Sequence, residues 1–283
     1  MIELDENTGL RDYNVSYETD NHSDGYFGKK IAGGCYVSGE ASYIQHIGDY
    51  YYLFISYGGL SAKEGYNIRV FRSKTPDGPY LDALGKSSLY DSYVQNFNQS
   101  VGVRLFGAYQ WRSMTTGEVA QGHNSAFVDN DGKAYIVFHT RTTNGTEAHY
   151  VKVHQLFVNE DGWIVAAPYF TDGETLNEKG YSREEVAGTY DVILHQLNVA
   201  YAKLDTNKPV TVTLGADGKI SGAYEGEWTL KGGTPYITLT IDGVNYKGVA
   251  LKMNIEKTNV ETLVFTALGD SNQLTIWGSK NVE

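Results

Sequence analysis

The amino-acid sequence predicts an all-β protein: part of a β-propeller, about two blades, followed by a small antiparallel β-barrel. Three observations lead to this prediction. Strand-length runs rich in β-branched and aromatic residues recur between turns made of Gly, Asp and Asn. The apolar spacing that is typical of amphipathic helices is nearly absent. A weak internal repeat also indicates a modular β architecture.

The first part of the chain contains a series of runs that we expect to form strands. They cover residues 50–56, 66–73, 125–128, 134–140, 149–158 and 163–166. Two segments, 90–97 and 182–186, are expected to form short helices. In the second of these, Ser182 stands at the N-cap position and Glu185 at the position that completes a capping box.

The internal repeat consists of a polar loop, a strand, an acidic turn and an aromatic-aliphatic strand. One copy begins at Glu40 and passes through the turn Gly48-Asp49, and the other begins at Asn124 and passes through Asp131-Gly132. The two copies lie about 80 residues apart, and repeats at a fixed spacing indicate repeated structural units. A propeller blade has about four strands, so two blades would fill roughly residues 12–175.

A polar segment at residues 171–180 separates these runs from a second group of predicted strands. The later strands are short, and tight turns such as 216–219 separate them. They are expected at residues 188–194, 210–214, 222–230, 236–241, 244–253, 262–267 and 273–278. Seven or eight antiparallel strands in about 100 residues suit a small closed barrel. We therefore expect two domains, residues 1–175 and 181–283, and no catalytic cluster in the second.

The composition narrows the classes of function. A net charge of −11 argues against nucleic-acid binding, because an acidic chain repels a phosphate backbone. A single cysteine, Cys35, rules out an intramolecular disulfide and a multi-cysteine metal site.

No apolar stretch approaches the length of about 18 residues that a membrane-spanning helix needs. The acidic N-terminus does not resemble a signal peptide. The first residues instead read as the middle of a strand, and we therefore expect this chain to be a piece of a longer protein.

Glu40 is the first candidate for chemistry. It is a lone carboxylate in a Gly/Ser-rich segment between aromatic strands, and no Lys or Arg stands next to it. A general acid is expected in such a setting, on a turn beside apolar strands. The alternative is an exposed turn glutamate, which is the more common role of this residue type.

His123 is the second candidate, in the sequence Gly122-His123-Asn124-Ser125. A histidine in a loop before a buried strand can bind an ion or orient a carboxylate, or it can simply bond the backbone. His139, His149 and His154 fall in predicted strands without the spacing of zinc ligands, so a zinc hydrolase is not expected. Glycine pairs at 33–34 and 58–59 precede no helix, which argues against a nucleotide-binding loop.

Several longer motifs occur in a fixed order along the chain. They cover residues 39–44, 50–59, 69–73, 78–80, 122–126, 138–141, 145–147 and 159–169. Together they resemble glycoside hydrolase family 43, specifically its arabinanases. The remaining residues are similar to the barrel domain that follows the propeller in two-domain arabinanases. The resemblance covers nearly the whole chain, which would be the C-terminal part of such an enzyme.

This resemblance implies a five-bladed propeller enzyme that hydrolyses α-1,5-linked arabinan with inversion, outside the cell. It assigns the general acid to Glu40. It assigns to His123 the channel histidine that helps to hold calcium or a similar cation. By position, Tyr36, Tyr109 and Trp111 would line the substrate cleft.

The resemblance also implies two aspartates upstream of the acid: a base and a second one that tunes the acid. Asp5, Asp12, Asp20 and Asp24 stand before Glu40, but none lies in the motifs of the family. We therefore expect the base to come from an N-terminal propeller portion in another chain, and this chain alone to be inactive. The alternatives are a non-catalytic carbohydrate-binding module or truncated remnant, and a purely structural β protein.

Overall fold

The chain is almost entirely β-structure in the computed structural model, which describes residues 1–17, 23–24, 27–93, 101–196 and 202–282. The one helix in these ranges is α1 (Arg183–Val186). This confirms the all-β prediction. Among the described helical residues, none form a segment long and apolar enough to cross a membrane.

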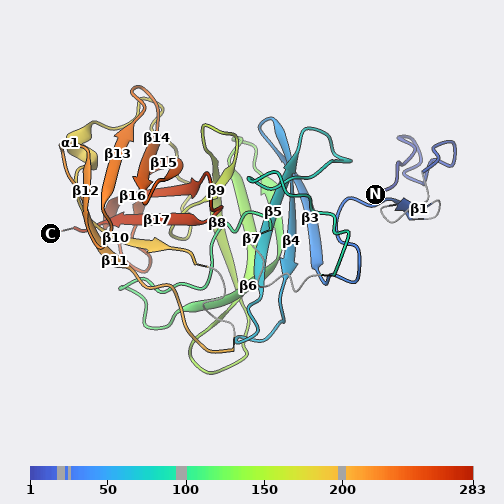
Figure 1. The fold of residues 1–283 in the computed structure, drawn as a ribbon, viewed down its shortest axis with the longest axis horizontal. Coiled ribbons are helices and arrows are strands. Elements are labelled where there is room, and N and C mark those ends of the chain that lie inside the picture. Colours follow the sequence, from blue (N-terminus) through green and yellow to red (C-terminus); the bar gives the residue numbers. More distant parts are fainter. Residues whose placement is uncertain (18–22, 25–26, 94–100, 197–201, 283) are drawn as a thin grey trace.

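Three antiparallel sheets occupy the N-terminal part of the chain, coloured blue to yellow-green in Figure 1. The smallest pairs β1 (Ser23–Asp24) with β2 (Gly28–Lys29). The second follows chain order through β3 (Glu40–Ile47), β4 (Tyr50–Tyr57) and β5 (Asn67–Ser73). The third also follows chain order, through β6 (Glu118–Val128), β7 (Ala134–Thr142), β8 (Tyr150–Val158) and β9 (Ile164–Ala166).

The two copies of the sequence repeat form the hairpins β3–β4 and β6–β7. Asp129 shapes the second turn, since its carboxylate accepts hydrogen bonds from the backbone N–H groups of Asp131 and Lys133 at 2.9 Å. Gly132 has a φ of +80° at that turn, which glycine adopts without strain. The repeat therefore marks equivalent hairpins, while the five-bladed propeller stays a prediction.

The C-terminal strands close into a barrel, as the sequence predicted. The strands are β10 (Gly188–Leu194), β11 (Val210–Leu214), β12 (Lys219–Gly222), β13 (Gly226–Leu230), β14 (Tyr236–Ile241), β15 (Val244–Asn254), β16 (Glu261–Gly269) and β17 (Thr275–Lys280). Each strand pairs with the next, and β17 pairs back with β10. In β14, Ile237, Leu239 and Ile241 are buried and alternate with half-buried residues, because successive side chains of a strand point to opposite faces.

The barrel and the sheet β6–β9 share a hydrophobic core. Trp277 of β17 is fully buried and stacks on His154 of β8, with ring centroids 5.8 Å apart. The hydroxyl of Thr275 donates a 2.7 Å hydrogen bond to the carbonyl of Arg104. The barrel is therefore packed directly on the sheet.

The capping-box prediction is confirmed at α1. The backbone N–H of Ser182 donates to the carboxylate of Glu185, and the N–H of Glu185 donates to the hydroxyl of Ser182. The predicted domain boundary, between residues 175 and 181, falls just before this helix. The division into domains 1–175 and 181–283 stays a prediction.

Two other local predictions are wrong where the structure describes them. The N-terminal residues form no strand but only an isolated bridge between Leu4 and Arg11. Asp5 closes the turn between them by accepting a 2.8 Å hydrogen bond from the N–H of Thr8. Residues 90–93 are not helical, and residues 94–97 of that predicted helix lie outside the described residues.

Candidate active site around Glu40

Glu40 is the first residue of β3 and pairs with Ser56 of β4. A β-bulge follows it, and Ala41 has a φ of +53°. Bulges re-aim side chains and are frequent beside active sites. The sequence placed Glu40 on a turn beside apolar walls, whereas its side chain is exposed at the beginning of a strand.

The side chain of Tyr66 fixes the carboxylate of Glu40. The phenol oxygen of Tyr66 lies 2.5 Å from Oε1 of Glu40 and donates its proton to it. The Tyr66 ring is buried against Gly122 of β6: a Cβ atom on Gly122 would lie only 1.9 Å from Cε1 of that ring. Glycine at position 122 therefore leaves the room that Tyr66 needs to reach Glu40.

A short series of hydrogen bonds joins this pair to His123. The backbone N–H of His123 donates to the hydroxyl of Ser56 at 2.8 Å, and Ser56 is hydrogen-bonded to the phenol of Tyr66. His123 has a φ of +50° and lies where the pairing of β6 with β7 is irregular. The two residues that the sequence singled out, Glu40 and His123, are thus connected through two that it did not, Ser56 and Tyr66.

Two further histidines surround this arrangement. The ring of His139 stacks on Tyr66 with centroids 5.6 Å apart, and it lies 6.3 Å from His123 and 4.7 Å from His149. Burial lowers the pKa of His139 to about 4, and the two neighbouring histidines add to the shift. His139 is therefore neutral at neutral pH. The sequence expected His149 in a strand, but it lies just before β8, in an irregular segment.

The buried guanidinium of Arg141 holds two nearby loops together. Its Nε donates to the carbonyl of Leu60 at 2.8 Å, and it forms an ion pair with Glu147 at 3.1 Å. Glu147 in turn accepts a 3.1 Å hydrogen bond from the N–H of Ala62. Because β7 carries both Arg141 and His139, this network ties the segments 60–62 and 147–149 to the strand whose His139 stacks on Tyr66.

The three predicted cleft residues lie in different surroundings. Tyr36 is 99% exposed on the loop before β3. Tyr109 is fully buried, and its hydroxyl donates to Glu118 at 3.2 Å. Trp111 is 2% exposed, and its indole N–H donates to the carbonyl of Pro168. In this structure Tyr109 and Trp111 are core residues that offer no ring face to a ligand beside Glu40. The sequence could not show this, because burial here depends on packing against the barrel.

From the sequence, calcium or a similar cation is expected at His123. Calcium takes about six to eight oxygen ligands. Across the described ranges no three His, Cys, Asp or Glu side chains are grouped so that they could hold a metal ion. A cation at His123 would need ligands from elsewhere and stays a prediction. Of the four upstream aspartates, Asp5 and Asp12 cap local turns, and Asp20 lies outside the described residues.

The sequence matches two known families. Residues 13–164, more than half of the chain, match the glycosyl hydrolases family 43. Residues 168–278 match a C-terminal lipocalin-like domain.

Two relatives are named extracellular endo-α-(1→5)-L-arabinanases. The one from Bacillus subtilis is 40% identical, and the match covers 90% of this chain and 55% of the relative. The one from Thermotoga petrophila is 41% identical, over 98% of this chain and 58% of the relative. The chain therefore spans little more than half the length of either relative.

Solved structures share the fold. The family 43 YxiA protein from Bacillus licheniformis superposes with a TM-score of 0.85 and 36% identity, over 100% of this chain and 62% of that one. The endo-1,5-α-L-arabinanase from Thermotoga petrophila superposes with a TM-score of 0.83 and 40% identity, over 99% and 62%. These matches show that the chain belongs to glycosyl hydrolase family 43.

Proposed function

We propose that this chain acts in the extracellular hydrolysis of arabinan and cleaves α-1,5-linked L-arabinofuranosyl bonds with Glu40 as the general acid. The substrate and the location rest on the two relatives named extracellular endo-α-(1→5)-L-arabinanases. The role of Glu40 rests on one observation, the 2.5 Å hydrogen bond from Tyr66, which holds an exposed carboxyl group in a fixed orientation. Orienting a proton donor toward the leaving group is what general acid catalysis requires.

In this mechanism the protonated carboxyl of Glu40 gives its proton to the glycosidic oxygen as the bond breaks. Tyr66 then donates to the carboxylate that remains. Burial and the hydrogen bond to Glu40 both raise the pKa of Tyr66 above its ordinary value of 10. The phenol therefore keeps its proton and serves as a fixed donor, while Glu40 is the group that gains and loses a proton.

An inverting mechanism needs a second carboxylate. Acid and base lie about 6.5–9.5 Å apart in inverting glycosidases, with a water molecule between the base and the sugar. The contacts of Glu40 described above are with Tyr66 and Ser56 and include no second carboxylate, so we infer that the base comes from a further propeller portion in another chain. Both relatives are longer than the matched region, which covers 55% and 58% of their length. A calcium or similar cation at His123 would take its other ligands from the same portion.

The test is an assay of linear arabinan hydrolysis by this chain alone and together with a chain that supplies the remaining part of a relative. We expect hydrolysis only from the combination, and release of the inverted anomer by proton NMR. In the combination, Glu40→Gln should lower turnover by about 10²–10⁴-fold, while a control at an exposed position, Glu225→Gln, should not change it. Full activity of the chain alone would refute the need for a second portion. Release of the retained anomer would refute inversion.

A further inference from the structure

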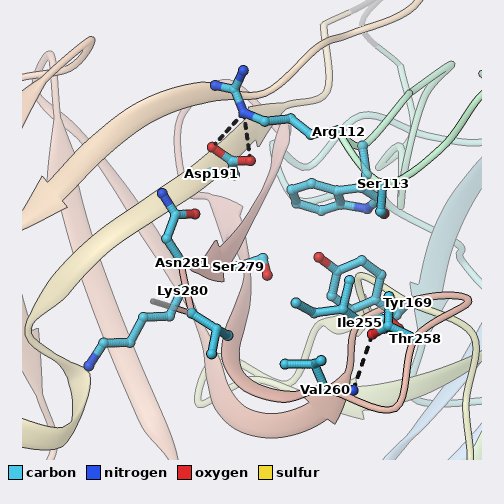
Figure 2. Close-up of a pocket in the computed structure, with 12 residues that line it drawn as sticks. Arg112, Ser113, Tyr169, Asp191, Ile255, Thr258, Val260, Ser279, Lys280 and Asn281 are labelled. Carbon is cyan, nitrogen blue, oxygen red and sulfur yellow. Dashed lines mark hydrogen bonds and ion pairs between the residues drawn. The ribbon is translucent and has the colours of Figure 1, made fainter.

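A cavity of about 410 Å³ lies where the barrel meets the sheets. Its walls come from the loop 111–113, from Tyr169, from β10, from the β15–β16 turn and from the end of β17 (Figure 2). Strand β3, which begins with Glu40, lies on the other side of the molecule from β10 and β17 (Figure 1). The cavity is therefore separate from the site around Glu40, and its volume is within the range of small-molecule sites.

One wall is polar and carries balanced charge. Nε of Arg112 donates to both carboxylate oxygens of Asp191, at 2.9 and 2.8 Å, and Nη2 of Arg112 reaches the hydroxyl of Thr211 at 3.3 Å. Asn281 lies beside this ion pair with its amide group directed toward the same space (Figure 2). Arg112 and Asp191 neutralise each other, so this pair offers donors and acceptors without net charge. Lys280 also lines the pocket, and its Nζ donates to the carbonyl of Glu185 at 2.7 Å.

The opposite wall is largely apolar. The rings of Trp111 and Tyr169 lie against each other, with centroids 5.3 Å apart, and Ile255 and Val260 continue the surface. The hydroxyl of Tyr169 is hydrogen-bonded to that of Ser279, so two hydroxyl groups lie between the apolar wall and the polar one (Figure 2). An apolar wall facing a few fixed polar groups is the usual composition of a ligand site.

We propose that this cavity is a second saccharide-binding site, which holds a short stretch of a neutral arabino-oligosaccharide away from the catalytic carboxyl. Sugar hydroxyls would bond Asp191, Arg112 and Asn281, and the C–H groups of the sugar would pack on Val260 and Ile255. A neutral ligand fits because Arg112 and Asp191 neutralise each other, and the ammonium of the third charged lining residue, Lys280, already donates to the carbonyl of Glu185. The choice of arabinose rests on the proposed function, whereas the site itself does not.

The test is a titration of α-1,5-arabinotriose into the isotope-labelled chain, followed by amide NMR. We expect saturable shifts in residues 111–113, 255–260 and 279–282. Val260→Trp, which places a large side chain at an exposed position of the wall, should abolish them. Asn281→Ala should weaken binding by roughly 3–10-fold, the effect of one hydrogen bond. Val128→Trp, at another exposed position, is the matched control and should leave binding unchanged.

Three outcomes distinguish this site from the catalytic one. Shifts that persist unchanged in Val260→Trp, or no shifts in this region in the unsubstituted chain, would overturn the second site. Glu40→Gln should leave the shifts intact, since Glu40 lies elsewhere. If the unsubstituted assembled enzyme does not hydrolyse arabinan while the shifts are present, the proposed function is overturned and the second site stands.

Discussion

The phenol of Tyr66 donates a 2.5 Å hydrogen bond to Oε1 of Glu40, and the ring that carries it is packed on Gly122 of the neighbouring sheet. The same hydroxyl is bonded to Ser56, which accepts from the backbone of His123. The orientation of one carboxyl group in β3 is thus set by the backbone of β6. This coupling between two sheets makes the site sensitive to changes at residues that never touch a substrate.

Removing the Tyr66 hydroxyl should impair catalysis more than binding. In Tyr66→Phe the carboxylate of Glu40 loses a donor, and a hydrogen bond to a charged group contributes about 1.5–3 kcal/mol. We expect kcat of the assembled enzyme on arabinan to fall by roughly 10–100-fold with little change in KM. Tyr43→Phe, on the same strand as Glu40, is the control. An unchanged kcat in Tyr66→Phe would show that the hydrogen bond does not position the acid.

A single methyl group at position 122 should have a similar effect. In Gly122→Ala the added Cβ would lie 1.9 Å from the Tyr66 ring, so the ring must move away from Glu40. Overpacking of this kind costs about 1–3 kcal/mol of stability, which a thermal melt would record together with lost activity. Gly232→Ala adds a methyl group where nothing lies within 4 Å and should be neutral. Wild-type activity of Gly122→Ala would contradict the packing described here.

The buried ion pair between Lys152 and Glu118 should be important for stability. Their charged atoms lie 2.8 Å apart, and Glu118 is 2% exposed. Lys152→Met would leave the carboxylate buried without its cation, which costs about 3–5 kcal/mol. Lys219→Met breaks the exposed pair with Glu227 and should leave stability almost unchanged, because solvent screens such pairs. Urea unfolding would measure the free energy of unfolding of both variants. An equal loss of stability in the two would show that the Lys152–Glu118 pair contributes no more than an exposed one.

Glu256, on the β15–β16 turn, should make stability fall as pH rises. Burial raises the pKa of Glu256 from its ordinary 4.5 to about 7, and the nearby carboxylate of Glu118 adds to the shift. Between these two values the folded chain holds a proton that the unfolded chain has lost. Stability is therefore lost progressively from about pH 4.5 to pH 7, by roughly 3 kcal/mol in total.

The amide of Glu256→Gln is neutral at every pH, so the variant should escape this loss. The melting temperature of the variant minus that of the parent should increase from pH 5 to pH 8, while Glu225→Gln should show no such trend. Burial lowers the pKa of His154 to about 4, which acts in the opposite direction, but His154 is present in both chains and cancels in the difference. A difference that does not change with pH would contradict a neutral Glu256.

Local signals in the sequence were sufficient for much of the fold. The capping box at Ser182 and the acidic turn at Asp131-Gly132 depend on residues a few positions apart, and both were predicted. The closed barrel also followed from the series of short strands and tight turns. These signals lie within strands, turns and hairpins, whereas the pairing that closes the barrel joins β10 to β17 at the two ends of the domain.

The candidate site could be predicted only in part, because its contacts join distant residues. Tyr66 lies 26 positions from Glu40, and nothing in its own neighbourhood indicates that its hydroxyl reaches a carboxylate. The contact between His139 and His149 depends on how an irregular segment folds back before β8. Tyr109 and Trp111 were expected in a cleft, but packing against Trp277 of the barrel makes them core residues.

The most direct test of Glu40 as general acid compares two substrates in the assembled enzyme carrying Glu40→Gln. Linear arabinan has a poor leaving group that must be protonated, whereas a dinitrophenyl arabinoside has one that leaves without a proton. We predict that turnover of arabinan falls by about 10²-fold or more, while turnover of the dinitrophenyl substrate stays close to that of the parent enzyme. Equal losses on both substrates, or undiminished hydrolysis of arabinan, would contradict the assignment.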